Sequence, residues 1–208
     1  MLAARRHMRA ILGPSYISYS SGEGYLSTSL VINKPSGVLS GDLLVAAMVG
    51  STFTGASGWT EKIDQGAAPA LRIATLTAGG SEPSSYTFTA ASGVNTVGQI
   101  ICLRNAQFDV LGASVTTLSG DGNLVITAVT SAGGIILAFV ATDSASSTIG
   151  HTTPSGMTLI NTKTHSVVGY PVLSSFVQEV ASGSTGTRTS TTSGTTTTNG
   201  GILMGVKK

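Results

Sequence analysis

Charged residues are scarce in this sequence, and their scarcity excludes several classes of protein. Only 10% of the 208 residues are Asp, Glu, Lys or Arg, and the formal net charge is +2. Nucleic-acid-binding proteins usually gather Lys and Arg on one face, with aromatic side chains between them. No such cluster occurs between the two ends of this chain, so we expect no direct contact with nucleic acid.

Cysteine and long apolar runs are nearly missing as well. The single cysteine, Cys102, cannot form an internal disulfide, and it lies in an apolar run where a thiol behaves as a small buried hydrophobic group. The longest apolar run, residues 134–141, is far shorter than the ~20 residues of a membrane-spanning helix. The first twelve residues lack the apolar core of a signal peptide. We therefore expect no membrane contact and no dependence on disulfides.

Catalytic and metal-binding motifs are also absent. The sequence holds no Cys-x-x-Cys, His-x-x-x-His, Gly-x-Ser-x-Gly or phosphate-binding loop. His151 and His165 fall in expected loops downstream of Asp143, and we interpret them, with His7, as scattered polar residues rather than metal ligands. The acidic residues permit a glycosidase-like pair of carboxylates but do not indicate one. We predict a protein that is no enzyme and holds no metal or cofactor.

What the sequence does contain is Thr, Val and Ile, which favour strands because branched side chains fit a pleated sheet. Short strand patterns recur along the whole chain, mostly separated by Gly, Pro, Ser or Asn, as in sandwiches and barrels. The expected strands are Tyr16–Ser20, Leu26–Ile32, Asp42–Val49, Trp59–Ile63, Leu71–Leu76, Ser85–Thr89, Val97–Arg104, Ala113–Leu118, Asn123–Val129, Ile135–Thr142, Met157–Asn161, Val172–Glu179, Thr187–Thr192 and Ile202–Val206.

The chain repeats itself, with offsets of 94 residues at the first shared strand, 92 at the second and 101 at the last. Both copies contain a Leu-Val-Ile segment, then a Gly-led apolar run, then a Ser-Gly turn. Each apolar run has the character of a central strand that is buried on both faces. A unit of this kind cannot bury its apolar face alone, so we predict that the two copies pack face to face.

These observations predict an all-β protein, an antiparallel, jelly-roll-like β-sandwich of two pseudo-repeated halves. The boundaries that we expect are an N-terminal arm at 1–25, a first repeat at 26–104, a linker at 105–120 and a second repeat at 121–206. Within the arm, residues 1–12 form a short helix or extended segment. We interpret the Thr-rich run 185–198 as an exposed edge hairpin, because Thr favours strands without making the edge apolar.

Five short motifs stand out along the chain. They are 34–37 (Lys-Pro-Ser-Gly), 41–44 (Gly-Asp-Leu-Leu), 57–60 (Ser-Gly-Trp-Thr), 82–89 (Glu-Pro-Ser-Ser-Tyr-Thr-Phe-Thr) and the hinge-like 104–110. In these motifs the sequence resembles a family of duplicated β-sandwich proteins found in phage structural proteins and bacterial surface proteins. The resemblance covers nearly all of residues 27–208, and Met157 departs from it at a position where a second aromatic is expected. It implies a structural role and no catalytic residue.

Two motif residues have competing interpretations. Asp42 either accepts backbone amide hydrogen bonds at the turn into a central strand or serves as a metal or acid–base group. Trp59, the only tryptophan, is either a core anchor or, together with the loop of His151, a platform that stacks on host glycan.

The basic residues lie at the two ends of the chain, and the body between them is mildly acidic. Arg5, Arg6 and Arg9 precede the sandwich, and Lys207 and Lys208 end the sequence. These tails are either solvated or contact an acidic protein shell or a phosphate surface.

With the resemblance, the basic tails predict a virion-surface protein made in the bacterial cytoplasm, a capsid decoration or cement protein. It would be a homotrimer bound to the major capsid protein. The alternative is a tail-fibre or receptor-binding module at the tail baseplate that contacts glycan through Trp59 and His151. A glycan-degrading enzyme is the least favoured.

Overall fold

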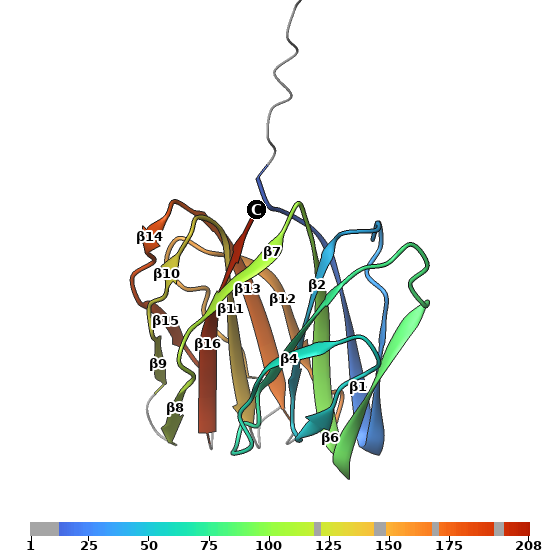
Figure 1. Ribbon diagram of the computed structural model, residues 1–208. Helices are drawn as coiled ribbons and strands as arrows, with labels where there is room; N and C mark the ends of the chain where they lie inside the picture. Colours follow the sequence, from blue (N-terminus) through green and yellow to red (C-terminus); the bar gives the residue numbers. More distant parts are fainter. Residues whose placement is uncertain (1–12, 119–121, 144–148, 168–170, 194–197) are drawn as a thin grey trace, which may run out of the picture.

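The computed structural model describes residues 13–118, 122–143, 149–167, 171–193 and 198–208. Sixteen strands and no helix occur in these parts of the chain (Figure 1). The first half contains β1 (Ser15–Asn33), β2 (Leu43–Val49), β3 (Phe53–Thr54), β4 (Thr60–Asp64), β5 (Arg72–Thr77) and β6 (Ser85–Arg104). The second half contains β7 (Gln107–Leu111), β8 (Val115–Leu118), β9 (Asn123–Ile126), β10 (Thr130–Ser131), β11 (Gly134–Asp143), β12 (Thr158–Thr164), β13 (Val172–Val180), β14 (Gly183–Ser184), β15 (Arg188–Thr191) and β16 (Thr198–Lys207).

Each half of the chain forms one antiparallel, six-stranded sheet. The first sheet has the order β1-β6-β2-β5-β4, with β3 beside β6. The second has the order β7-β16-β11-β13-β12, with β8 beside β16. The two orders match strand for strand, which confirms the β-sandwich of two pseudo-repeated halves.

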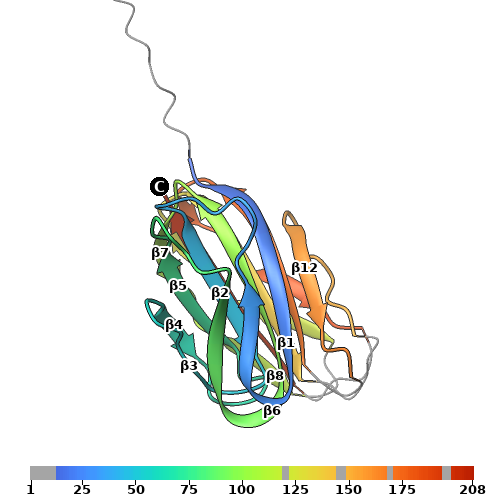
Figure 2. The same cartoon turned by 90° about the vertical axis from the view of Figure 1, so that its right-hand side faces the viewer.

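The two sheets pack face to face, and Figure 2 shows them as separate layers. At one margin Glu23 of β1 pairs with Lys163 of β12, and at the other Lys62 of β4 stands over the ring of Phe108 in β7. The first strand of each sheet therefore faces the last strand of the other. This is the arrangement that an approximate two-fold axis between the halves would produce.

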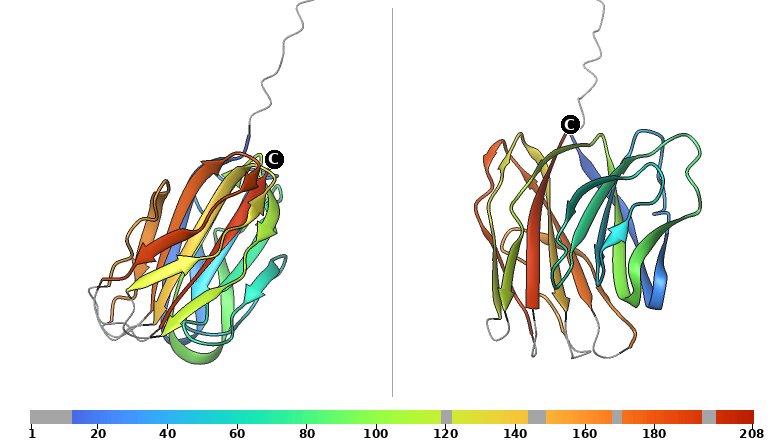
Figure 3. Two further views of the ribbon diagram at one scale, coloured as in Figure 1. Left: turned by 90° about the vertical axis from the view of Figure 1, so that its left-hand side faces the viewer. Right: turned by 60° about the horizontal axis from the view of Figure 1, so that its bottom comes forward.

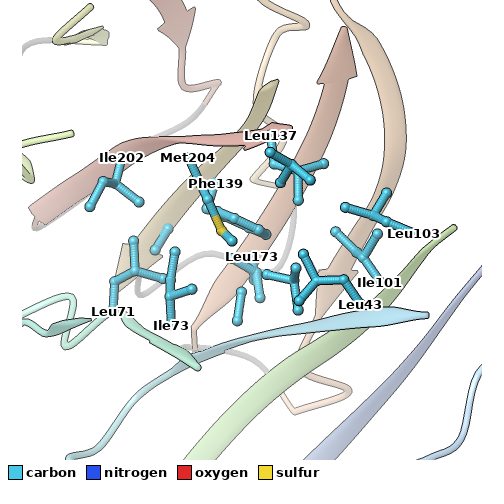
Figure 4. Packing of buried hydrophobic residues seen from close by; sticks show 14 of the residues in the cluster. Leu43, Leu71, Ile73, Ile101, Leu103, Leu137, Phe139, Leu173, Ile202 and Met204 are labelled. Atoms are coloured by element: carbon cyan, nitrogen blue, oxygen red, sulfur yellow. The ribbon is translucent and has the colours of Figure 1, made fainter. Parts of the chain in front are cut away.

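A central core joins the halves, and alternate residues of the middle strands fill it. Leu43, Val45 and Ala47 of β2 point into this core together with Leu137 and Phe139 of β11 (Figure 4). The intervening residues of the same strands point away from it into two outer cores. Both central strands are therefore buried on both faces, as their continuous apolar sequences predict.

The two outer cores are covered in different ways. In the first half β1 and β6 bend together and fold back over their own sheet, which places Leu30 and Phe88 against it. Gly22 permits the close approach, because a Cβ there would lie 2.3 Å from the carbonyl oxygen of Val31. In the second half the separate pairs β9–β15 and β10–β14 take this place (Figure 3).

Strands extend into both segments that the sequence analysis set apart from the repeats. The arm predicted at 1–25 overlaps β1, which pairs with β6 from Ser15 onward, and the predicted linker 105–120 contains β7 and β8. The helix predicted within 1–12 lies outside the described residues. The strand register also corrects one predicted offset between the repeats. Val45 pairs with Ile101, and its counterpart Leu137 pairs with Met204. Ile101 therefore corresponds to Met204, so the offset between the last strands is 103 residues rather than the predicted 101.

The Thr-rich run does not form the predicted hairpin. β15 pairs with β9 in the outer layer, whereas β16 pairs with β11 in the large sheet. The two strands are consecutive in sequence but belong to different layers.

Candidate functional site

The chain ends mark one end of the sandwich. Gly13, where the described chain begins, and the C-terminus both lie at this end, which we call the terminal end (Figure 1). A cavity of about 770 Å³ opens there between the halves. Arg104 and Glu179 are its charged residues, and Ile17 and Val180 contribute apolar surface. The terminal end thus combines a recess, charge of both signs, the start of the described chain and the C-terminus.

Asp42 and Arg104 form an ion pair at the terminal end. The buried carboxylate of Asp42 accepts hydrogen bonds from Arg104 Nε at 3.0 Å and Nη2 at 2.9 Å, and one from the Leu39 amide at 2.8 Å. Burial raises the pKa of Asp42, but the hydrogen bonds from Arg104 and Leu39 outweigh burial and hold the pKa below its ordinary value. The backbone amide hydrogen bond that we expected for Asp42 at this turn is therefore present. Arg104 also donates hydrogen bonds to the same carboxylate.

Cys102 lies beneath the same ion pair. Its thiol is fully buried, 3.5 Å from Asp42 Oδ2. Burial and the nearby negative charge raise the pKa of the thiol to about 12, so it stays protonated and unreactive at neutral pH.

The structure describes only some of the basic residues of the two tails. Lys207 is part of β16, where its ammonium group lies 3.5 Å from Asp109 and remains 44% exposed. Lys208 follows it and is exposed. Arg5, Arg6 and Arg9 lie outside the described residues but precede Gly13 in the sequence.

Trp59 lies at the outer core of the first half. Its ring meets Tyr86 and Phe88 edge-on, with centroids 5.2 and 5.3 Å apart. The indole N–H is buried and has no hydrogen-bond partner. This is the environment of a core anchor, the first of the two interpretations of this residue. Met157 takes the corresponding place in the outer core of the second half.

His151 lies at the end of the second outer core, within a chain of neutral polar side chains. Its Nε2 is 2.7 Å from Thr142 Oγ1 and its Nδ1 is 2.8 Å from Ser174 Oγ. Thr142 Oγ1 is also 2.6 Å from Asn199 Oδ1, and Ser174 Oγ is 2.7 Å from Thr162 Oγ1. Burial lowers the pKa of His151 to about 4, so the ring is neutral at pH 7.

His165 occupies a different part of the molecule. It is buried between the halves, where Nδ1 accepts a hydrogen bond from the Val167 amide and Nε2 lies 3.1 Å from the Gly24 carbonyl oxygen. The two loop histidines are therefore not brought together. In the described parts of the chain no three His, Cys, Asp or Glu residues converge as metal ligands. No helix described there could cross a membrane.

Sequence reasoning missed the buried polar residues on the strands. Thr142, Ser174 and Asn199 are fully buried beside His151, and Gln99 is fully buried in the central core. Ser and Thr are so frequent in this sequence that nothing distinguished these positions. Most of β11 and the first five residues of β13 are buried without interruption, so no alternation of buried and exposed residues indicated them either.

Comparisons with known proteins give no further guide to the site. No protein-family model, curated protein or solved structure matches this chain.

Proposed function

We propose that the protein is a bacteriophage structural protein that decorates the capsid and binds the major capsid protein through its terminal end. The observation that carries this proposal is that Gly13, the first described residue, and the C-terminus lie at one end of a compact sandwich. Lys207 and Lys208 bring positive charge to this end, and Arg5, Arg6 and Arg9 precede Gly13 in the sequence. An acidic patch on a protein shell is the matching partner.

The rest of the sandwich supports a mechanical role. Asp42 and His151 are buried polar residues whose hydrogen bonds join neighbouring strands and loops of the sandwich. Three packed cores make the body stiff, because protein interiors have low compressibility. Three copies around a three-fold position of the shell would each present the terminal end to it.

The first test of this proposal is quantitative protein staining of purified virions beside the major capsid protein. We expect amounts close to those of the capsid protein. A few copies per particle would contradict a decorating role and favour the tail, and complete absence would exclude the virion.

A second test addresses the terminal end itself. Removal of residues 1–12, combined with Lys207→Glu and Lys208→Glu, should abolish binding to capsids that lack the protein. Binding by the unaltered protein should weaken as salt rises, because exposed charge pairs are screened. The matched control is Lys34→Glu with Arg188→Glu, which reverses two basic residues of the body. Equal loss in both variants would contradict docking through the terminal end.

The tail-fibre alternative is less well supported. It relies on Trp59 and His151 as glycan contacts, whereas Trp59 is partly buried against Tyr86 and Phe88 and His151 is buried.

A further inference from the structure

The chain of side chains around His151 has the geometry of a nucleophile, a base and an orienting group. Thr142 supplies a hydroxyl 2.7 Å from His151 Nε2, and Ser174 holds the opposite ring nitrogen at 2.8 Å. Thr162 in turn fixes Ser174. A hydroxyl beside a base that a third group orients is the arrangement by which proteins activate weak nucleophiles.

The histidine can act as the base, because its proton can reside on either nitrogen. Either hydroxyl of the Ser174–Thr162 pair can donate to the other. In the structure the Thr142 hydroxyl donates to Asn199 Oδ1 and therefore accepts from Nε2–H of His151. When Ser174 instead donates to Thr162 and accepts from His151 Nδ1–H, the lone pair of Nε2 faces Thr142, whose hydroxyl can turn its proton from Asn199 to His151. The low pKa of His151 keeps the ring neutral, which a base requires.

No outside substrate can reach this nucleophile. Thr142, Ser174 and Asn199 are each 0% exposed, and His151 is 8% exposed. The electrophile must therefore belong to the chain itself. The side-chain amide of Asn199 lies directly opposite Thr142 in the pairing of β11 with β16, with its oxygen 2.6 Å from the Thr142 hydroxyl.

We propose that Thr142 and Asn199 form an ester cross-link between β11 and β16, with His151 as the catalytic base. Thr142 Oγ1 bonds to Cγ of Asn199 while its proton passes to His151 Nε2. The Cγ–Nδ2 bond then breaks, the proton moves from His151 to the departing nitrogen, and ammonia leaves. An alcohol and an amide become an ester and ammonia, with no oxidant or reductant involved. Burial protects the ester, because water that would hydrolyse it is excluded.

The cross-link would hold together two neighbouring strands at the centre of the second sheet. In the first half the residues that correspond to Thr142 and Asn199 in this register are Gly50 and Thr96, which supply neither the attacking hydroxyl nor the side-chain amide at these positions. The inference does not depend on the proposed function, because the reaction needs only the folded chain.

The test is the intact mass of the purified, unfolded protein. The cross-linked chain should weigh about 17 Da less than its sequence requires, the mass of one ammonia. Thr142→Val and His151→Gln should restore the full sequence mass. Ser190→Ala removes another buried hydroxyl, on β15, and should leave the mass deficit unchanged, so it is the matched control.

Fragmentation after proteolysis locates the loss. A peptide containing residue 142 joined to one containing residue 199 is the expected product. A wild-type chain of full sequence mass would overturn the proposal. This measurement does not depend on whether any variant folds. A loss of ammonia confined to the Asn199 peptide alone would also overturn the proposal, because that identifies a cyclised asparagine instead.

Discussion

At the scale of single residues, the interior of this protein contains polar groups in places where apolar ones would be expected. Asp42, Gln99 and His151 are all buried. Most buried polar groups in proteins are hydrogen-bonded, and each of these side chains reaches at least one partner. The contacts that they make lead to two predictions.

The buried His151 should make stability depend on pH. Its pKa of about 4 in the folded chain lies below the ordinary value of 6.5, so the unfolded chain binds the proton first as pH falls. Stability should be constant above about pH 6.5 and fall by up to about 3 kcal/mol between pH 6.5 and pH 4. Urea unfolding across this range measures the effect. The difference between wild type and His151→Gln isolates it from other titrating groups, and a difference that does not change with pH would contradict the assignment.

Gln99 connects the two sheets through the central core. Its side-chain nitrogen donates a 2.8 Å hydrogen bond to the Leu173 carbonyl oxygen of β13, in the opposite half. Gln99→Ala leaves a cavity and removes this donor, so we expect a loss of about 2–4 kcal/mol in the free energy of unfolding. Thr87→Ala, at an exposed position of the same strand, should change it by less than about 0.5 kcal/mol. Equal effects would mean that Gln99 contributes no specific contact.

At the scale of strands and sheets, the pattern of residues predicted most of what the structure contains. The apolar runs of β2 and β11 are doubly buried because each of their faces meets a different core. The pattern failed where strands bend. The segment from Gly22 to Gly24 looks like a break between two strands, yet β1 continues through it, because pairing with β6 satisfies its backbone groups. Two-residue strands such as β3 are too short to leave a periodic signal.

The outer core of the first half should depend on Trp59. Trp59→Ala should lower the free energy of unfolding by about 3 kcal/mol, because it opens a cavity beside Tyr86 and Phe88. Trp59→Phe should cost less, since it keeps an aromatic ring and removes the unpartnered indole N–H. Urea midpoints measure both changes. Loss of capsid or glycan binding without a change in stability would show instead that Trp59 is a contact residue.

At the scale of the whole molecule, the repeat in the sequence becomes a pair of sheets with matching strand order. The sequence predicted this pairing because neither copy can bury its apolar face alone. It could not predict the terminal cavity or the buried polar chain, since both combine residues of several strands whose spacing follows from register. The basic residues of the two tails, in contrast, could be recognised in the sequence from their charge alone.

The central core should make the halves interdependent. A chain cut between residues 105 and 106 yields one sheet from each fragment, and each fragment alone exposes its side of the central core. We expect either fragment to be insoluble when it is produced alone and the two to form a soluble 1:1 complex when they are produced together. Gel filtration with light scattering measures the complex. A soluble, folded single fragment would show that an outer core suffices for folding.

The position of the C-terminus has a consequence for anyone who would use the protein as a display scaffold. A peptide fused after Lys208 would emerge from the terminal end, where it would stand between the sandwich and whatever surface that end contacts. The connection between β4 and β5 lies at the opposite end, beside Asp143 and Pro171. A cargo inserted there would face outward, so the fold itself dictates that insertion, rather than fusion, is the way to present a foreign epitope.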